Sequence, residues 1–138
     1  MARKEKIVVD ASIVTKWYSA EEGSDKAIEY MEKHIAGSIE LIVPALLLYE
    51  VANALNHKPD FTEEDLQRSM DALVDLSLTV EMPSKELMKR AVSFAKASDL
   101  SVYDSCYISL AEGLNAKMVT ADRRLLDKLR GYPLVSFL

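Results

Sequence analysis

The stretch Lys6-Ile-Val-Val-Asp10 places three β-branched residues in succession and ends on an acid. A short, continuously apolar run of this kind predicts a buried strand. In open α/β sheets, ligands bind in the crevice beyond the carboxyl ends of the strands. The stretch therefore predicts both a strand of the sheet and a functional position for Asp10.

On either side of the helical segments that follow, the chain repeats this pattern of brief apolar runs. Further strands are expected at residues 39–43, 78–81, 117–120 and 134–137. Capping residues and apolar spacing predict helices at residues 12–20, 24–36, 45–57, 62–75, from 84 onward, 101–113 and 121–130. Apolar strands separated by helices are typical of a parallel sheet that is covered on both faces. We therefore expect an α/β fold, a three-layer α/β/α sandwich with a central parallel sheet, in a single domain spanning residues 1–138.

Two helix boundaries carry explicit signals. Thr62 with Asp65 resembles a capping box, which predicts a helix beginning at this point. Gly113 is expected to end the helix that Ser101 begins, because glycine favours the left-handed conformation found after many helices.

Composition narrows the class of protein. The chain has 138 residues, 49% of them apolar and 28% charged, which suits one compact domain. Its single cysteine, Cys106, excludes an internal disulfide, fits a reducing cytoplasm and is expected to be a small core residue. We expect neither a signal peptide nor a membrane span, since the apolar runs are short. The net charge of −5 argues against a strongly cationic nucleic-acid binder, although metal ions and a local basic rim would still permit action on RNA.

Asp122 follows the expected strand 117–120 by two residues, so it should reach the same sheet edge as Asp10. The two acids are therefore expected to be neighbours, although they lie far apart in the sequence. The alternative for Asp10 is a helix-capping or loop acid. For Asp122 it is an acid in the first turn of a helix, where the macrodipole contributes about 0.3–1 kcal/mol.

Glu50 is the only charged residue in the otherwise apolar segment 43–55, so its helix should be mostly buried. A buried glutamate needs a partner, because removing an unpaired carboxylate from water is costly. Asn53, one helical turn further on, offers a second oxygen ligand or a hydrogen-bonding group on the same face. The alternative for Glu50 is a buried salt bridge to a lysine or arginine.

Asp104 lies three residues after Ser101, which is the spacing of a capping box. Capping alone could account for this acid. However, the helix that it begins is strongly apolar, so its first turn should lie against the core. Asp104 is therefore expected to be oriented as well as charged.

Together, the four acids supply only oxygen ligands, which suit Mg²⁺ or Mn²⁺ rather than a transition metal. Clustered carboxylates repel one another and remain ionised near neutral pH only when cations compensate them. The chemistry that follows is metal-assisted hydrolysis of a phosphodiester. Ser12 and Thr120, each two residues from an aspartate, could bind a carboxylate, a metal-bound water or a phosphate, and helix capping is the alternative for both. His34 and His57 are isolated and are expected to have surface roles.

Four segments carry a resemblance to a known family. They are Val8-Val-Asp10-Ala-Ser12, Leu48-Tyr-Glu50-Val-Ala-Asn53, Leu100-Ser-Val-Tyr-Asp104 with the helix after it, and Met118-Val-Thr120-Ala-Asp122. In this order and spacing they resemble the PIN domain, particularly the VapC-like toxins of toxin–antitoxin pairs.

The resemblance implies a PIN fold and an endoribonuclease that depends on Mg²⁺ or Mn²⁺. It assigns Asp10, Glu50, Asp104 and Asp122 to the acidic quartet that binds metal, and Ser12, Asn53 and Thr120 to supporting polar positions. It further implies an RNA substrate, a homodimer, and a small antitoxin that occupies the acidic groove. Some relatives carry another acid after the Thr-x-Asp motif, whereas Arg123, Arg124 and Leu125 follow here, which leaves the second metal position open.

Several residues near the motifs have two interpretations. A phosphate-facing basic rim is one interpretation of the cations Lys16, Lys117, Arg123, Arg124, Lys128 and Arg130, and ordinary solvated helix charges are the other. Trp17 and Tyr18 could stack on an RNA base, but a core or dimer position is favoured.

Three other functions compete with the nuclease. A haloacid-dehalogenase-like phosphatase would have Asp-x-Asp where this chain has Asp10-Ala-Ser12. A response-regulator receiver would need an acidic pair before its phosphorylated aspartate and a lysine later in the chain, and this sequence does not provide that set. A non-catalytic PIN-like module that binds RNA or protein would usually lack members of the quartet, and all four are present.

Overall fold

The computed structural model describes residues 3–138 and is built around one sheet of parallel strands. The sheet has five strands in the order β3-β2-β1-β4-β5. The strands are β1 (Glu5–Val9), β2 (Ile39–Pro44), β3 (Thr79–Glu81), β4 (Lys117–Thr120) and β5 (Val135–Phe137). The expected α/β sandwich with a central parallel sheet is confirmed.

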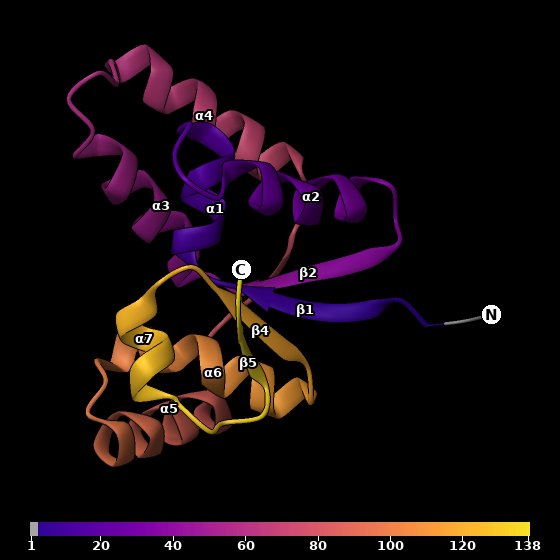
Figure 1. Cartoon of the computed structure of the whole chain (residues 1–138), viewed down its shortest axis with the longest axis vertical. Helices are drawn as coiled ribbons and strands as arrows, with labels where there is room; N and C mark the ends of the chain where they lie inside the picture. The colour runs from indigo at the N-terminus through magenta and orange to yellow at the C-terminus, as the bar shows by residue number, and fades with distance from the viewer. Residues whose placement is uncertain (1–2) are drawn as a thin grey trace.

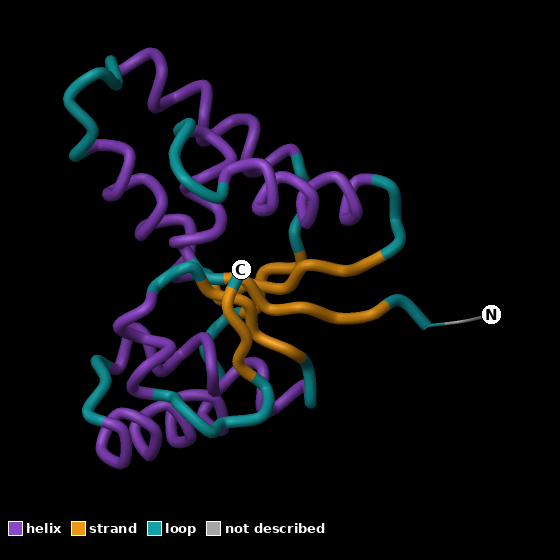
Figure 2. The backbone as a smooth tube through the Cα atoms, in the orientation of Figure 1, coloured by secondary structure: helices purple, strands orange, loops and turns teal. Residues whose placement is uncertain are grey.

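Helices cover both faces of this sheet (Figures 1 and 2). They are α1 (Ala11–Tyr18), α2 (Ser24–Ile35), α3 (Leu46–Asn56), α4 (Glu63–Asp75), α5 (Lys85–Ser98), α6 (Val102–Leu114) and α7 (Arg123–Lys128). Helices α1 to α4 lie on one side of the sheet and α5 to α7 on the other (Figure 1). Among residues 3–138, no helix is long and apolar enough to cross a membrane.

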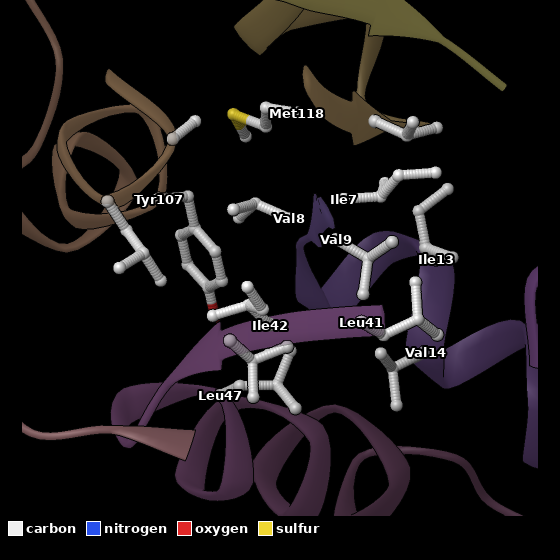
Figure 3. Packing of buried hydrophobic residues seen from close by; sticks show 14 of the residues in the cluster. Ile7, Val8, Val9, Ile13, Val14, Leu41, Ile42, Leu47, Tyr107 and Met118 are labelled. Atoms are coloured by element: carbon white, nitrogen blue, oxygen red, sulfur yellow. The ribbon is translucent and has the colours of Figure 1, made fainter. Parts of the chain in front are cut away.

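Strand β1 forms the centre of the core (Figure 3). Successive side chains of a strand point to opposite faces, yet Val8 and Val9 are both 0% exposed, so both faces of β1 are covered. This explains why the opening stretch is continuously apolar instead of alternating. Tyr107 of α6 joins the same core and is only 1% exposed.

The strand order reverses at β1. The chain proceeds from β1 to β2 and β3 on one side, then returns to place β4 on the other side of β1. Val9 pairs with Val119, so the ends of β1 and β4 are nearly level. A crevice beyond the carboxyl ends of such strands is where open α/β sheets bind ligands. Asp10 and Asp122 follow these two strands.

We expected Gly113 to end helix α6, and this prediction was wrong. The helix passes through Gly113 and ends at Leu114, and its C-cap Asn115 has a φ of 50° in the left-handed region. Asparagine tolerates this region because its short polar side chain bonds locally. Gly113 serves packing instead, since a Cβ built there would lie 2.7 Å from Nη1 of Arg90.

The boundaries of two other helices also differ from those expected. Helix α1 begins at Ala11 with Asp10 as its N-cap, and α7 is a short helix with Asp122 as its N-cap. The capping box at the start of α4 is confirmed, because Thr62 and Asp65 each bind the other's backbone N–H.

Candidate active site

Asp10 is the most deeply placed of the four acids, with 6% of its surface exposed. One carboxylate oxygen accepts hydrogen bonds from the backbone N–H of Ser12 at 3.1 Å and from the Ser12 hydroxyl. The other oxygen accepts from the hydroxyl of Thr120. Burial raises the pKa of Asp10 to about 6, although hydrogen bonds from Ser12 and Thr120 oppose the shift and the charge of Asp122 adds to it.

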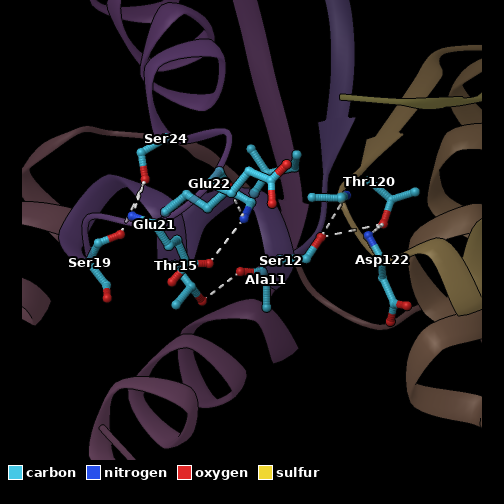
Figure 4. A network of polar contacts seen from close by, with 12 residues as sticks. Ala11, Ser12, Thr15, Ser19, Glu21, Glu22, Ser24, Thr120 and Asp122 are labelled. Atoms are coloured by element: carbon cyan, nitrogen blue, oxygen red, sulfur yellow. Dashed lines mark hydrogen bonds and ion pairs between the residues drawn. The ribbon is translucent and has the colours of Figure 1, made fainter.

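Ser12 and Thr120 join the turns that follow β1 and β4 (Figure 4). Ser12 Oγ accepts a hydrogen bond from the backbone N–H of Ala121 at 2.8 Å. Thr120 Oγ1 accepts from the backbone N–H of Asp122 at 3.0 Å while it donates to Asp10. The two hydroxyls therefore hold Asp10 and Asp122 in register, and neither acts as a helix cap.

Asp122 uses one side-chain oxygen to cap α7. Its Oδ1 accepts hydrogen bonds from the backbone N–H groups of Arg124 at 3.0 Å and Leu125 at 3.3 Å. The capping alternative is thus correct for Asp10, whereas Asp122 is the N-cap of α7 and not the first-turn acid of its alternative. Neither cap excludes a second role, because a carboxylate offers about four lone-pair positions.

Glu50 lies half-buried on α3 and accepts a hydrogen bond from the hydroxyl of Tyr107 on α6. Burial is the main cause that raises the pKa of Glu50; the Tyr107 bond lowers it and the charge of Asp104 raises it again. Within residues 3–138, Glu50 forms no ion pair, so the salt-bridge alternative is wrong.

Asp104 is in the first turn of α6, where its backbone N–H donates to Ser101 Oγ at 3.0 Å. Burial raises the pKa of Asp104, as does the charge of Asp122, while Ser101, Lys128 and Arg124 lower it. The pKa effects between these side chains place the acids of α3, α6 and the β4–α7 turn within electrostatic reach of one another.

A single pocket of about 280 Å³ collects all four acids. It is lined by Asp10, Ala11, Ser12, Glu50, Asn53, Ala54, Asp104, Tyr107 and Asp122. None of the four acids pairs with a lysine or arginine in the part of the chain that the structure describes. We call this pocket the acid pocket.

The acid pocket fits a hard cation by its chemistry. Its donors are carboxylate, amide and hydroxyl oxygens, the ligands that Mg²⁺ prefers. Burial is the main cause that raises the pKa values of Asp10, Glu50 and Asp104, and a bound cation would oppose this shift. The side chains do not converge on one point, however: across residues 3–138, no three Asp, Glu, His or Cys side chains are placed to hold a metal ion together.

Comparison with known proteins identifies the family. The family model of the PIN domain matches residues 7–131. Ribonuclease VapC3 of Pyrobaculum aerophilum is 32% identical over 127 residues, covering 89% of this chain and 94% of that protein. The chain belongs to the PIN-domain family.

A second relative and two solved structures resemble this PIN domain, the structures in fold alone. Ribonuclease VapC9 of Mycobacterium tuberculosis is 32% identical over 98 residues, covering 69% of this chain and 75% of the relative. A chain of a toxin–antitoxin complex from Klebsiella pneumoniae has the same fold, with a TM-score of 0.71 at 17% identity over 94% of this chain and 95% of the other. VapBC2 from Rickettsia felis, solved with a promoter DNA fragment, gives a TM-score of 0.71 at 12% identity over 96% and 98% of the two chains.

Tyr107 is the residue of this pocket that sequence reasoning missed. It looked like a core residue because it lies in an apolar helix, and it is indeed buried. Its hydroxyl nevertheless reaches Glu50, and burial together with that bond raises the pKa of Tyr107. The sequence feature that could have identified Tyr107 is its position one helical turn after Asp104, on the same face of α6.

The remaining candidates lie outside the acid pocket. The expected surface role is wrong for His34, which is half-buried: its Nδ1 accepts from the Leu41 N–H at 3.1 Å and its Nε2 contacts the Leu76 carbonyl at 3.1 Å. Cys106 is buried, as expected. Trp17 packs against the core and donates to the Ala27 carbonyl at 2.8 Å, which favours the core interpretation over RNA stacking.

The basic-rim interpretation holds for only some of the cations, and for the others the solvated-charge interpretation stands. Arg124 and Lys128 lie close enough to Asp104 to lower its pKa. Arg123 stacks on the Phe137 ring instead, 4.4 Å from its centre, and does not line the acid pocket. Lys117 was wrongly included, because it begins β4 and therefore lies at the opposite edge of the sheet.

Proposed function

We propose that this PIN domain is an endoribonuclease that hydrolyses RNA phosphodiester bonds with a Mg²⁺ or Mn²⁺ ion. The observation that carries the proposal is the gathering of Asp10, Glu50, Asp104 and Asp122, from four separate segments, in one pocket without a cationic partner. The relatives named Ribonuclease VapC3 and VapC9 support the same reaction. Its role is then that of the toxin in a toxin–antitoxin pair, acting in the cytoplasm.

The four acids are the residues that would hold the ion, with Asn53 as a further oxygen donor. When bound, the ion would lower the pKa of the attacking water molecule and stabilise the negative charge on the leaving oxygen. Ser12 and Thr120 fix both oxygens of Asp10, so that its carboxylate keeps one orientation. The hydroxyl of Tyr107 holds one oxygen of Glu50 in the same way. Such supporting hydrogen bonds usually change metal affinity or activity about 10–100-fold when removed.

The basic residues after Asp122 favour substrate binding over a second metal. Arg123 and Arg124 occupy the places where some relatives carry another acid, so fewer carboxylates remain for a second ion. Arg124 and Lys128 lie close enough to Asp104 to lower its pKa, although Lys128 also donates to the Asp99 carbonyl at 2.7 Å, and cations at such a place can meet phosphates. We propose that these two cations form the substrate rim of the acid pocket.

A homodimer is proposed from an exposed apolar face. Met82, Val102 and Tyr103 are 70%, 38% and 64% exposed, and the last two line an apolar hollow of about 200 Å³. Tyr49, on the neighbouring α3, is 76% exposed. Large exposed apolar residues grouped in this way mark interaction sites, and a second copy of the chain would cover them.

The second proposed partner is a small antitoxin. Structures with the same fold are described as toxin–antitoxin complexes, which supports such a partner here. The acid pocket offers it an anionic target, and a basic side chain would satisfy the uncompensated carboxylates.

Cleavage assays separate the enzyme from a non-catalytic RNA-binding module. We expect purified protein to cleave a structured RNA with Mg²⁺ or Mn²⁺ and not with EDTA. Asp104→Asn should lower the rate at least about a hundred-fold, because it removes a charge that is needed in the transition state. Asp71→Asn is the matched control, since Asp71 is exposed on α4 outside the acid pocket. RNA binding without cleavage by the wild type would favour the binding module.

Metal titration gives a second, independent readout. Calorimetric titration of Mn²⁺ into metal-free protein should show binding to the wild type and a clear loss of affinity in Asp10→Asn. Equal affinity in both proteins would contradict the assignment of Asp10 to the metal site.

A further inference from the structure

A second charged feature lies outside the acid pocket. A hollow of about 470 Å³ is formed where β1 and β4 begin, next to the turn between α6 and β4. Four cations line it, and we call it the basic hollow: Arg3, Lys4, Lys6 and Lys117.

The basic hollow is separate from the candidate active site. Strands β1 and β4 are parallel, so their first residues meet at one edge of the sheet and their last residues at the other. Lys6 lies near the start of β1 and Asp10 directly follows its end, four residues on, which at about 3.3 Å per residue is about 13 Å through the core. Helices cover both faces of the sheet between the two edges (Figure 1). A ligand that touches both edges must therefore pass around the outside of the molecule.

The charges of the basic hollow are not compensated by the protein. Within residues 3–138, none of its four cations forms an ion pair or a side-chain hydrogen bond. Glu5 is the one acid among its lining residues. All four cations are exposed. Like charges gathered in one place repel, and here they do so in a chain with a net charge of −5. An anionic ligand would relieve this repulsion.

We propose that the basic hollow binds the phosphate backbone of the RNA substrate, so that this PIN domain prefers RNA long enough to contact both edges of the sheet. The inference rests on the proposed ribonuclease function. A polyanion suits the hollow better than a compact anion, because its cations come from the starts of two strands and are spread around an open surface. Lysine and arginine meet phosphates without reading sequence, so the contact would select length and shape.

Binding measurements in EDTA test the hollow without cleavage. The variant Lys4→Gln/Lys6→Gln/Lys117→Gln removes three exposed charges, and Lys85→Gln/Lys89→Gln/Lys96→Gln on α5 removes the same number elsewhere. Each lost contact to single-stranded RNA should reduce the slope of log affinity against log salt by about 0.7, or about 2 for three. Between about 50 and 200 mM salt, the wild type should lose roughly sixteen-fold more affinity for a labelled RNA of about 40 nucleotides than the hollow variant.

Two results of the binding test would overturn the proposal. One is a hollow variant whose salt slope equals that of the α5 control. The other is a hollow variant that binds RNA as tightly as the wild type but has lost affinity for labelled polyglutamate. That outcome would assign the hollow to an acidic protein partner.

Kinetics with Mg²⁺ test the length preference. The length preference is the kcat/KM for an RNA of about 40 nucleotides divided by the kcat/KM for an RNA of about six nucleotides. We expect this ratio to fall roughly ten-fold in the hollow variant and to stay unchanged in the α5 control. An unchanged ratio in the hollow variant would refute the length preference. If the wild type cleaves neither RNA, the proposed nuclease function fails, while the binding comparison in EDTA still decides whether the hollow binds RNA.

Discussion

Replacing Asp10 by asparagine is expected to stabilise the metal-free protein near neutral pH, although Asp10 is a central residue of the acid pocket. The side chain is 6% exposed, and burial raises its pKa from 3.8 to about 6. Folding therefore removes a charged carboxylate from water without a cation to compensate it. Asparagine has nearly the same shape and carries no charge, so it avoids this penalty.

The size of the effect follows from the pKa shift. A shift from 3.8 to about 6 corresponds to about 3 kcal/mol, at about 1.4 kcal/mol per pKa unit. The pKa of Asp10 is higher in the folded protein than in the unfolded chain. Its contribution to the free energy of unfolding is therefore fully present below about pH 3.8 and is lost as the pH rises through about 6. Asparagine cannot accept the Thr120 hydrogen bond at its amide nitrogen, which costs about 1 kcal/mol. We expect a net gain of about 2 kcal/mol at about pH 7.5 and no gain at about pH 4.

Urea unfolding in EDTA at these two pH values measures the effect. Asp71→Asn is the control, because Asp71 is exposed and its substitution should change the free energy of unfolding little at either pH. Adding Mg²⁺ at neutral pH should stabilise the wild type more than Asp10→Asn, since a ligand that binds only the folded state stabilises it. An Asp10→Asn protein destabilised equally at both pH values would show that the hydrogen bonds of Asp10 outweigh its burial, and would refute the reasoning.

Three further outcomes are expected. Tyr107→Phe should keep the fold, because the ring packs in an apolar core and is 1% exposed. It should lower the cleavage rate about 10–100-fold, because Glu50 loses its hydrogen bond. Equal activity of this variant and the wild type in the cleavage assay would contradict the positioning role of Tyr107. Gly113→Ala should lower the free energy of unfolding by about 1–2 kcal/mol in urea. Its Cβ displaces the Arg90 guanidinium from the 2.7 Å bond to the Ser109 carbonyl, which costs about 1.5–3 kcal/mol, while the higher helix propensity of alanine offsets about 0.5–1 kcal/mol. A stabilised variant would show that Arg90 moves without loss. Tyr103→Lys should convert the proposed dimer into a monomer, as measured by light scattering. Val74→Lys is the control, because Val74 is also exposed but lies on α4, and this variant should stay dimeric. A dimeric Tyr103→Lys protein would place the interface elsewhere.

Most of the fold could be predicted because the signals for it are local. Continuous apolar runs mark buried strands wherever both faces of a sheet are covered, as at Val8 and Val9. The Thr62–Asp65 capping box forms between residues three positions apart, so neighbouring residues are enough to predict it. The end of α6 was missed for a physical reason of another kind. Gly113 is conformationally permissive, but contact with Arg90 in α5 determines its use.

The candidate site was predicted to different degrees. Asp10 and Asp122 meet in one pocket, which agrees with the expectation that strand ends gather functional groups, whereas Glu50 and Asp104 reach it from α3 and α6. Whether the acids bind metal stays a prediction. The partners of each acid could not be predicted, because Tyr107 and Glu50 are far apart in the sequence and both segments resemble ordinary core helices. Lys117 was misplaced because charge clustering was judged along the sequence, whereas the start and end of β4 face opposite edges of the sheet.

The sequence by itself determined the parallel α/β architecture and the acids at the strand ends, because both depend on short-range periodicity and on residue type. Only the tertiary structure decided which hydroxyl holds which carboxylate, that Glu50 has no cationic partner in the described chain, and that the cations divide between two edges of the sheet. These properties depend on distances between segments that only the packing of the sheet and its helices brings together.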